Sequence, residues 1–119
     1  MNEYENEIKL LKAISHPARL AILETLHQQE ACVCHLEAMF GWRQAYISQQ
    51  LMVLREAGLI ADRRDGWNVF YSISQPEIFL VLDAVKQVTG NANQLDLPLA
   101  ALETCTCPHC QVEEKTPAA

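Results

Sequence analysis

The 119-residue chain has no long hydrophobic run, although half of its residues are hydrophobic. Its apolar stretches are all shorter than the ~18 residues that a transmembrane helix requires. Residues 1–7 are acidic and lack the basic and then apolar segments of a signal peptide. We therefore expect a cytoplasmic protein with no membrane partner, in a compartment that keeps thiols reduced.

Glycine is also scarce, with four residues, and none of them forms a glycine-rich phosphate loop. The sequence shows no convincing general base beside a nucleophile, and the chain is short for an enzyme with a substrate cleft. These absences argue against an enzyme, including a cysteine enzyme.

Basic residues are outnumbered, since nine Lys and Arg stand against fifteen Asp and Glu for a net charge of −6. The overall charge of such a protein gives it no long-range attraction to nucleic acid. The segment 42–73 departs from this trend, because its four arginines outnumber its three acids. Attraction to phosphate is local, so this segment is able to face DNA in an acidic protein.

Apolar residues at helical spacing predict helices over 7–14, 19–28, 32–40, 43–57 and from Pro76 to Gly90. Gly41 and Gly58 are placed to end the third and fourth of these helices. Runs of β-forming residues flank Asp65-Gly66, and both residues of that pair tolerate positive φ, so a β-hairpin is expected there.

This order of elements predicts a mostly α fold with a β-hairpin wing, a winged helix-turn-helix, over residues 1–90. Residues 91–119 are less regular and form a C-terminal extension that contains cysteines. The helical spacing assigns three residues of the fourth helix to the core: Tyr46, Leu51 and Leu54. Packing on the face of the hairpin is expected for its aromatic residues: Trp67, Phe70 and Tyr71.

Two of the five cysteines, Cys32 and Cys34, flank Val33 at the predicted start of the third helix. A helix N-terminus favours negative charge and therefore favours thiolates. In a regular helix residues i and i+2 point about 200° apart. Both thiols can face one ion only if the first turn loosens, and that distortion would reach the helix-turn-helix that follows.

The remaining cysteines, Cys105, Cys107 and Cys110, form a second cluster with His109. Soft ligands select soft ions; three thiolates suit trivalent arsenic or antimony, and four suit cadmium, lead or zinc. One site could combine Cys32 and Cys34 with extension cysteines of the same subunit or of a partner. Alternatively, the extension is a separate zinc knuckle, or Cys32 is only a small buried hydrophobe.

Three segments of the chain resemble the ArsR/SmtB family of bacterial metalloregulatory repressors. Residues 15–23 are similar to the opening of the family's second helix, and Cys32-Val33-Cys34 to its metal box. Residues 44–60 are similar to its recognition helix and entry to the wing. The chain departs from the family pattern at His35, where Asp is usual, and at Arg43, where Ser or Thr is usual.

The resemblance implies a homodimer that binds double-stranded operator DNA with an inverted repeat. The implied DNA contacts lie on the recognition helix and beside the hairpin tip: Arg43, Gln44, Ser48, Gln49, Arg63 and Arg64. The implied dimer interface lies on the first and last helices, and the same residues could instead complete a monomer core: Leu10, Leu11, Phe79, Leu82 and Val85.

The function favoured by these patterns is a transcriptional repressor that a thiophilic ion releases from its operator. Arsenite or antimonite is the first expectation for the thiolate-bound ion, followed by cadmium, lead or zinc. A thiol redox-responsive repressor on the same scaffold is the main alternative. A small metal-buffering protein without DNA binding is a further alternative, which leaves the polar residues Gln44 and Ser48 unexplained.

Overall fold

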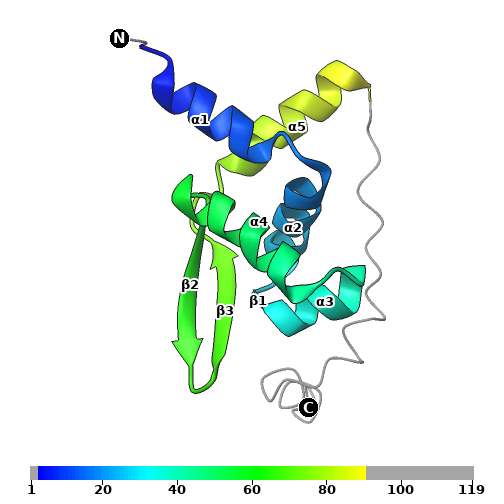
Figure 1. The fold of residues 1–119 in the computed structure, drawn as a ribbon. Helices are drawn as coiled ribbons and strands as arrows, with labels where there is room; N and C mark the ends of the chain where they lie inside the picture. The colour runs from blue at the N-terminus through cyan, green and yellow to red at the C-terminus, as the bar shows by residue number, and fades with distance from the viewer. Residues whose placement is uncertain (1–2, 91–119) are drawn as a thin grey trace, which may run out of the picture.

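The computed structural model describes residues 3–90 (Figure 1). Its elements follow in the order α1 (Glu5–Ile14), α2 (Pro17–Gln28), β1 (Ala31–Cys32), α3 (Val33–Phe40), α4 (Gln44–Glu56), β2 (Ile60–Asp65), β3 (Asn68–Ile73) and α5 (Ile78–Thr89). The mostly helical order with a hairpin between the last two helices is confirmed. None of the helices in 3–90 is long and apolar enough to cross a membrane. The predicted extension, 91–119, with its cysteines, lies outside the described residues.

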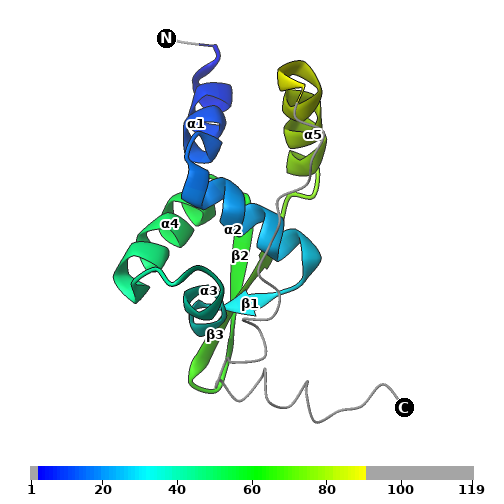
Figure 2. The same cartoon turned by 90° about the vertical axis from the view of Figure 1, so that its right-hand side faces the viewer.

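The helices gather around one core, and the hairpin extends away from it. In Figures 1 and 2, α2, α3 and α4 lie at the centre of the molecule, and β2 and β3 project from one end. The α1 and α5 helices project from the opposite end. The fold thus separates a helical end, formed by α1 and α5, from a hairpin end.

The core is built from one apolar face of each central helix. The largest fully buried side chains are Ile22, Leu23, Leu36, Ile47, Leu51, Leu54 and Phe70. Burying an aliphatic side chain of this size contributes about 1.5–3 kcal/mol. The core assignment of Leu51 and Leu54 is confirmed. That of Tyr46 is wrong, because its side chain is 37% exposed.

Local sequence signals fix where the central helices begin and end. The α2 helix begins at Pro17, where the missing N–H would be unpaired in any case. The His16 ring caps it, since Nδ1 accepts a hydrogen bond from the Ala18 N–H at 3.1 Å. The α3 helix ends at Gly41, whose φ of +69° lies in the left-handed region that favours glycine. The predicted helix-turn-helix therefore has the expected stop.

A short strand, β1, precedes α3 and was not predicted. It pairs with β3 in an antiparallel sheet of order β1-β3-β2, with Ala31 opposite Tyr71 and Cys32 opposite Phe70. Cys32 therefore lies in the strand and is the N-cap of α3, with an extended backbone. The expectation that Cys32 starts the third helix is wrong, because cross-strand pairing with β3 holds its backbone extended.

The hairpin turn falls one residue later than expected. Asp65 pairs with Asn68, so the two turn residues are Gly66 and Trp67. Gly66 has φ +64° and Trp67 does not have positive φ, which matches a type II′ turn with glycine first. Trp67 is 99% exposed at the tip, so its predicted packing is wrong. The predicted packing of Phe70, 1% exposed, is confirmed.

Candidate DNA interface and thiol site

The α4 helix presents a polar face to solvent from its first residue onward. Gln44, Ser48 and Gln49 are exposed, whereas Ile47 and Leu51 of the same helix are buried in the core. Gln44 and Ser48 are one helical turn apart, so their side chains share a face. This face is polar and exposed at the N-terminal end of the helix, as a helix that enters a DNA major groove requires.

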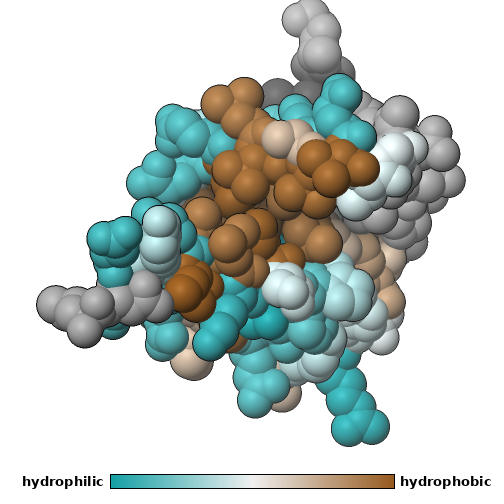
Figure 3. Space-filling view, turned by 90° about the horizontal axis from the view of Figure 1, so that it is seen from above, coloured by the Kyte–Doolittle hydropathy of each residue, from teal (hydrophilic) through white to brown (hydrophobic). Residues whose placement is uncertain are grey.

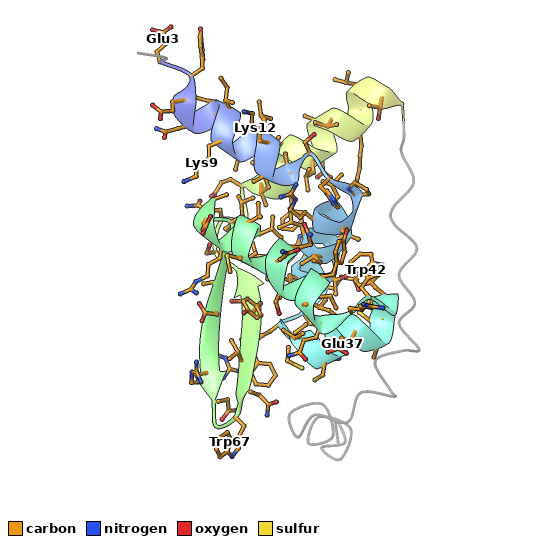
Figure 4. All side chains as sticks on the ribbon, in the orientation of Figure 1. Glu3, Lys9, Lys12, Glu37, Trp42 and Trp67 are labelled. Carbon is orange, nitrogen blue, oxygen red and sulfur yellow. The ribbon has the colours of Figure 1, made fainter. Side chains whose placement is uncertain are left out.

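Aromatic rings surround the N-terminus of α4. The Phe40 and Trp42 rings stack with centroids 4.4 Å apart, and the Trp42 and Tyr46 rings meet edge to face at 5.7 Å. In Figure 4, the labelled Trp42 lies beside the junction of α3 and α4. Beside these rings is an open, largely apolar hollow of about 540 Å³ that Pro17 and Arg43 also line. The rings hold the helix-turn-helix junction in place, a role that sequence spacing did not reveal.

The two arginines of the hairpin have different surroundings. The Arg63 guanidinium donates two hydrogen bonds to the Glu30 carboxylate, at 2.6 and 2.8 Å, and lies over the Phe70 ring. These bonds to Glu30 raise the pKa of Arg63. Arg64 is exposed and forms no ion pair with any residue in 3–90. Of the two DNA contacts predicted on the hairpin, Arg64 is thus open to solvent, whereas Arg63 is held by the Glu30 carboxylate.

An ion pair also connects the α4 helix to the hairpin. Arg55, in the last turn of α4, contacts Asp62 of β2 with Nε and Oδ1 3.1 Å apart. Arg55 is 61% exposed and Asp62 31% exposed, so the pair is weak, at about 0–1 kcal/mol. Burial and the nearby Asp62 raise the pKa of the Tyr71 phenol. The last turn of α4 is therefore tied to the hairpin by a side-chain contact.

The two thiols lie between the helix-turn-helix and the hairpin. Cys32 is 3% exposed and forms a small cluster with Phe70, against which the half-buried Cys34 packs. Neither forms a disulfide with another described residue. Cys34 lies in the first turn of α3, and α3 packs directly on α4. The two thiols therefore contact the hairpin strand β3 and lie at the start of the helix that packs on α4.

The described residues do not complete a metal site on their own. Within 3–90 no three His, Cys, Asp or Glu side chains come together in a way that could hold an ion. Of the predicted ligands, Cys32 and Cys34 lie within this range. The predicted additional ligands, Cys105, Cys107 and Cys110, lie outside the described part of the chain.

The predicted interface residues of α1 and α5 divide into two groups. Phe79 and Leu82 are buried within the protomer, and the centroids of the stacked Phe79 and His27 rings are 3.6 Å apart. These two residues therefore belong to the core of one protomer, as the alternative prediction had it. Leu11 and Val85 are about half exposed, and Leu10 is partly buried. Other exposed apolar residues of the same helices were missed by the sequence analysis: Ile8, Leu80 and Val88. Figure 3 shows hydrophobic side chains gathered on this end of the molecule.

Comparison with known proteins gives these features a family. The model of the bacterial regulatory protein, arsR family, matches residues 16–62, from the cap of α2 into β2. The chain is 43% identical over 76 residues to the biofilm growth-associated repressor of Agrobacterium fabrum; the match covers 64% of this chain and 65% of that protein, slightly under two thirds. It is 40% identical over 86 residues to the Mycobacterium tuberculosis HTH-type transcriptional regulator Rv0081, covering 71% and 75% of the two chains.

Solved structures agree with the sequence matches. The crystal structure of Rv0081 superposes with a TM-score of 0.69 at 37% identity, over 76% of this chain and 91% of that chain. A Mycobacterium bovis protein described as a homodimeric winged helix-turn-helix DNA-binding domain has the same fold, with a TM-score of 0.67 at 23% identity, over 79% of this chain and 91% of that chain. The predicted winged helix-turn-helix is confirmed. The chain belongs to the ArsR family of bacterial regulatory proteins, which are DNA-binding transcriptional regulators and not enzymes.

Proposed function

We propose that this chain is a homodimeric transcriptional repressor whose affinity for operator DNA is lowered by chemistry at Cys32 and Cys34. The observation that carries the proposal is the position of the two thiols. Cys32 pairs with Phe70 of the hairpin, and Cys34 lies in the helix that packs on α4. A change in the thiols therefore alters the relative placement of the two elements that meet DNA.

DNA recognition is assigned to the exposed face of α4 and to the hairpin. Gln44 and Ser48 have the hydrogen-bonding groups for base edges, since Gln pairs with adenine and Ser with several bases. Arg43 and Gln49 flank them, and Arg64 is open to a backbone phosphate. The segment that carries these residues is the least acidic in the chain, which reduces repulsion where DNA would lie.

Dimerisation through α1 and α5 is supported by the exposed apolar residues on these helices. Leu11, Leu80 and Val88 are 52%, 71% and 88% exposed, respectively. A contiguous apolar surface of this kind is typical of an interaction site. A two-fold dimer presents two α4 helices related by the symmetry axis and predicts an operator with an inverted repeat, with half-sites one or two helical turns apart.

The proposed effector is a thiophilic ion, with trivalent arsenic or antimony first and cadmium, lead or zinc next. Cys32 and Cys34 would supply two thiolates, and at least one of Cys105, Cys107 and Cys110 a third. When bound, such an ion supplies strong bonds to thiolate sulfur. Because Cys32 is 3% exposed, its thiol must leave the contact with Phe70 before it can bind a ligand in common with Cys34.

Redox control is the second candidate, and the unequal exposure of the two thiols favours it. Cys34 is half-buried at a helix N-terminus, where a thiolate is stabilised, whereas Cys32 is buried. A peroxide or polysulfide could accept two electrons as Cys34 and a cysteine of 91–119 lose two protons and form a disulfide. A metal-buffering protein without DNA binding is disfavoured, because it would leave the exposed polar face of α4 without a role.

The test is fluorescence anisotropy of the reduced protein on duplexes selected for binding from a pool of inverted repeats. Arsenite, antimonite, cadmium, lead, zinc and peroxide are then added one at a time at fixed salt. We expect at least one reagent to release the wild type, and Cys32→Ser/Cys34→Ser to bind DNA but resist release. Cys34→Ser alone is the second variant, because it leaves the buried Cys32 intact. Undiminished release of both variants would overturn the assignment.

A further inference from the structure

Three residues form a row across the three-stranded sheet. Cys32 of β1 pairs with Phe70 of β3, and Arg63 of β2 pairs with the same Phe70 on its other side. Residues directly opposite each other on neighbouring strands project to the same face of a sheet. The cross-strand row (Cys32, Phe70 and Arg63) therefore joins a thiol at one edge of the sheet to a candidate DNA contact at the other.

Glu30 lies beside this row and contacts its far end. The residue precedes β1 directly, and its carboxylate accepts hydrogen bonds from Arg63 Nε at 2.8 Å and Nη2 at 2.6 Å. The Arg63 guanidinium carbon lies 5.0 Å from the centre of the Phe70 ring. The Arg63 side chain is still 51% exposed, and that of Glu30 28%. The Arg63 guanidinium is therefore held by Glu30 and is still accessible from solvent.

The geometry of this contact matches the one that DNA would need. A carboxylate and a phosphate both accept two parallel hydrogen bonds from the edge of one guanidinium. Glu30 therefore occupies the donors with which Arg63 would bind a backbone phosphate. The contact joins residues 33 positions apart in the chain, and it links the segment before the thiols directly to the hairpin.

We propose that Glu30 is a positioning residue that competes with DNA phosphate for Arg63 and couples Cys32 to the hairpin. The coupling rests on the proposed thiol control; the competition does not. On docking, Arg63 exchanges the Glu30 carboxylate for a phosphate. When Cys32 is ligated or oxidised, its thiol leaves Phe70, β1 shifts, and Glu30 draws Arg63 away from the DNA backbone.

The competition is tested without any effector, by measuring DNA affinity against salt concentration. Glu30→Gln frees Arg63, so we expect at least threefold tighter binding at moderate salt. Each phosphate contact contributes about 0.9 to the salt slope, so Arg63→Gln should make the slope shallower by about two for a dimer. Arg63→Gln should weaken binding, and the double variant should match Arg63→Gln alone, because the proposed competition acts through Arg63.

Glu77→Gln is the matched control, since it removes the same charge from an exposed residue that forms no ion pair within 3–90. Glu77→Gln is expected to change DNA affinity much less than Glu30→Gln does. Equal effects of the two variants, or an effect of Glu30→Gln that persists in Arg63→Gln, would overturn the competition.

The coupling is tested with a reagent that releases the wild type, arsenite first. We expect at least threefold weaker release of Glu30→Gln than of the wild type and of Glu77→Gln. Equal release of all three would overturn the coupling and leave the proposed thiol control standing. A wild type that no reagent releases would instead refute the proposed function, and the salt-dependence test would still decide the competition between Glu30 and phosphate.

Discussion

Removing the Phe70 ring gives the sharpest test of how the thiol site is built. The Phe70 side chain is 1% exposed and packs against Cys32 and Cys34, so Phe70→Ala leaves a cavity beside both thiols. Core substitutions of Phe by Ala cost about 3–5 kcal/mol. A domain of this size has about 5–15 kcal/mol of stability in total. The variant should therefore remain folded with a much lower urea midpoint.

The same substitution should expose Cys32 to reagents. A buried thiol is labelled only when the protein opens and exposes it. Each 1.4 kcal/mol by which a substitution lowers the free energy of this opening makes labelling about tenfold faster. If Cys32 is exposed by global unfolding, a loss of about 3–5 kcal/mol in unfolding free energy predicts that its labelling is roughly one-hundred-fold to several-thousand-fold faster. The assay is thiol labelling of a protein in which only Cys32 remains, because the other four cysteines are replaced by serine.

The matched control is Phe70→Leu, which keeps an apolar side chain at the site and should cost less than Phe70→Ala. A loss of under about 1 kcal/mol for Phe70→Ala, which is typical of a substitution anywhere in a protein, would contradict a structural role of the ring at the thiol site. That role is also contradicted if Cys32 is labelled at the wild-type rate, because then the ring does not protect the thiol.

Substitutions in the turn, the sheet and the helical end should also have measurable effects. Gly66→Ala should lose about 1–2 kcal/mol in urea unfolding, since φ of +64° is strained for a residue with Cβ; an unchanged midpoint would contradict the turn. The raised pKa of Tyr71, caused by burial and then by Asp62, favours the neutral phenol in the folded state. Its contribution to stability is full below about pH 10 and is lost as the pH rises through the raised pKa. In a 295 nm titration, Tyr71→Phe should lose the component that ionises above the ordinary tyrosine range, and retention of that component would contradict the assignment. Leu11→Asp combined with Val85→Asp should convert the proposed dimer to monomer in sedimentation, and should leave the helical content unchanged; a dimer that survives both charges would place the interface elsewhere.

The helices were predictable because their signals are local. Apolar spacing identified the α4 helix, and Gly41 and Gly58 correctly indicated where α3 and α4 end. The Asp65-Gly66 pair between two runs of β-forming residues located the wing, although the two turn residues are Gly66 and Trp67. A two-residue loop needs positive φ at only one position when glycine comes first, so the Asp-Gly pattern alone did not fix the register.

The features that sequence analysis missed depend on contacts between distant residues. The β1 strand has two residues, too few to show a period, and it exists because β3 lies beside it. The Glu30–Arg63 pair spans 33 positions, and its members appeared in the sequence only as charges. Tyr46 is exposed although it was expected in the core, since helical spacing shows which residues share a face but not what covers that face.

Coupling between the thiols and DNA must be thermodynamically reciprocal, and this reciprocity can be measured. The measurement is the affinity of the reduced protein for the releasing ion, arsenite first, with and without saturating operator duplex. If the ion weakens DNA binding by a given factor, DNA must weaken ion binding by the same factor. We expect equal factors in the wild type and none in Cys32→Ser/Cys34→Ser. An ion affinity that DNA leaves unchanged would contradict the account.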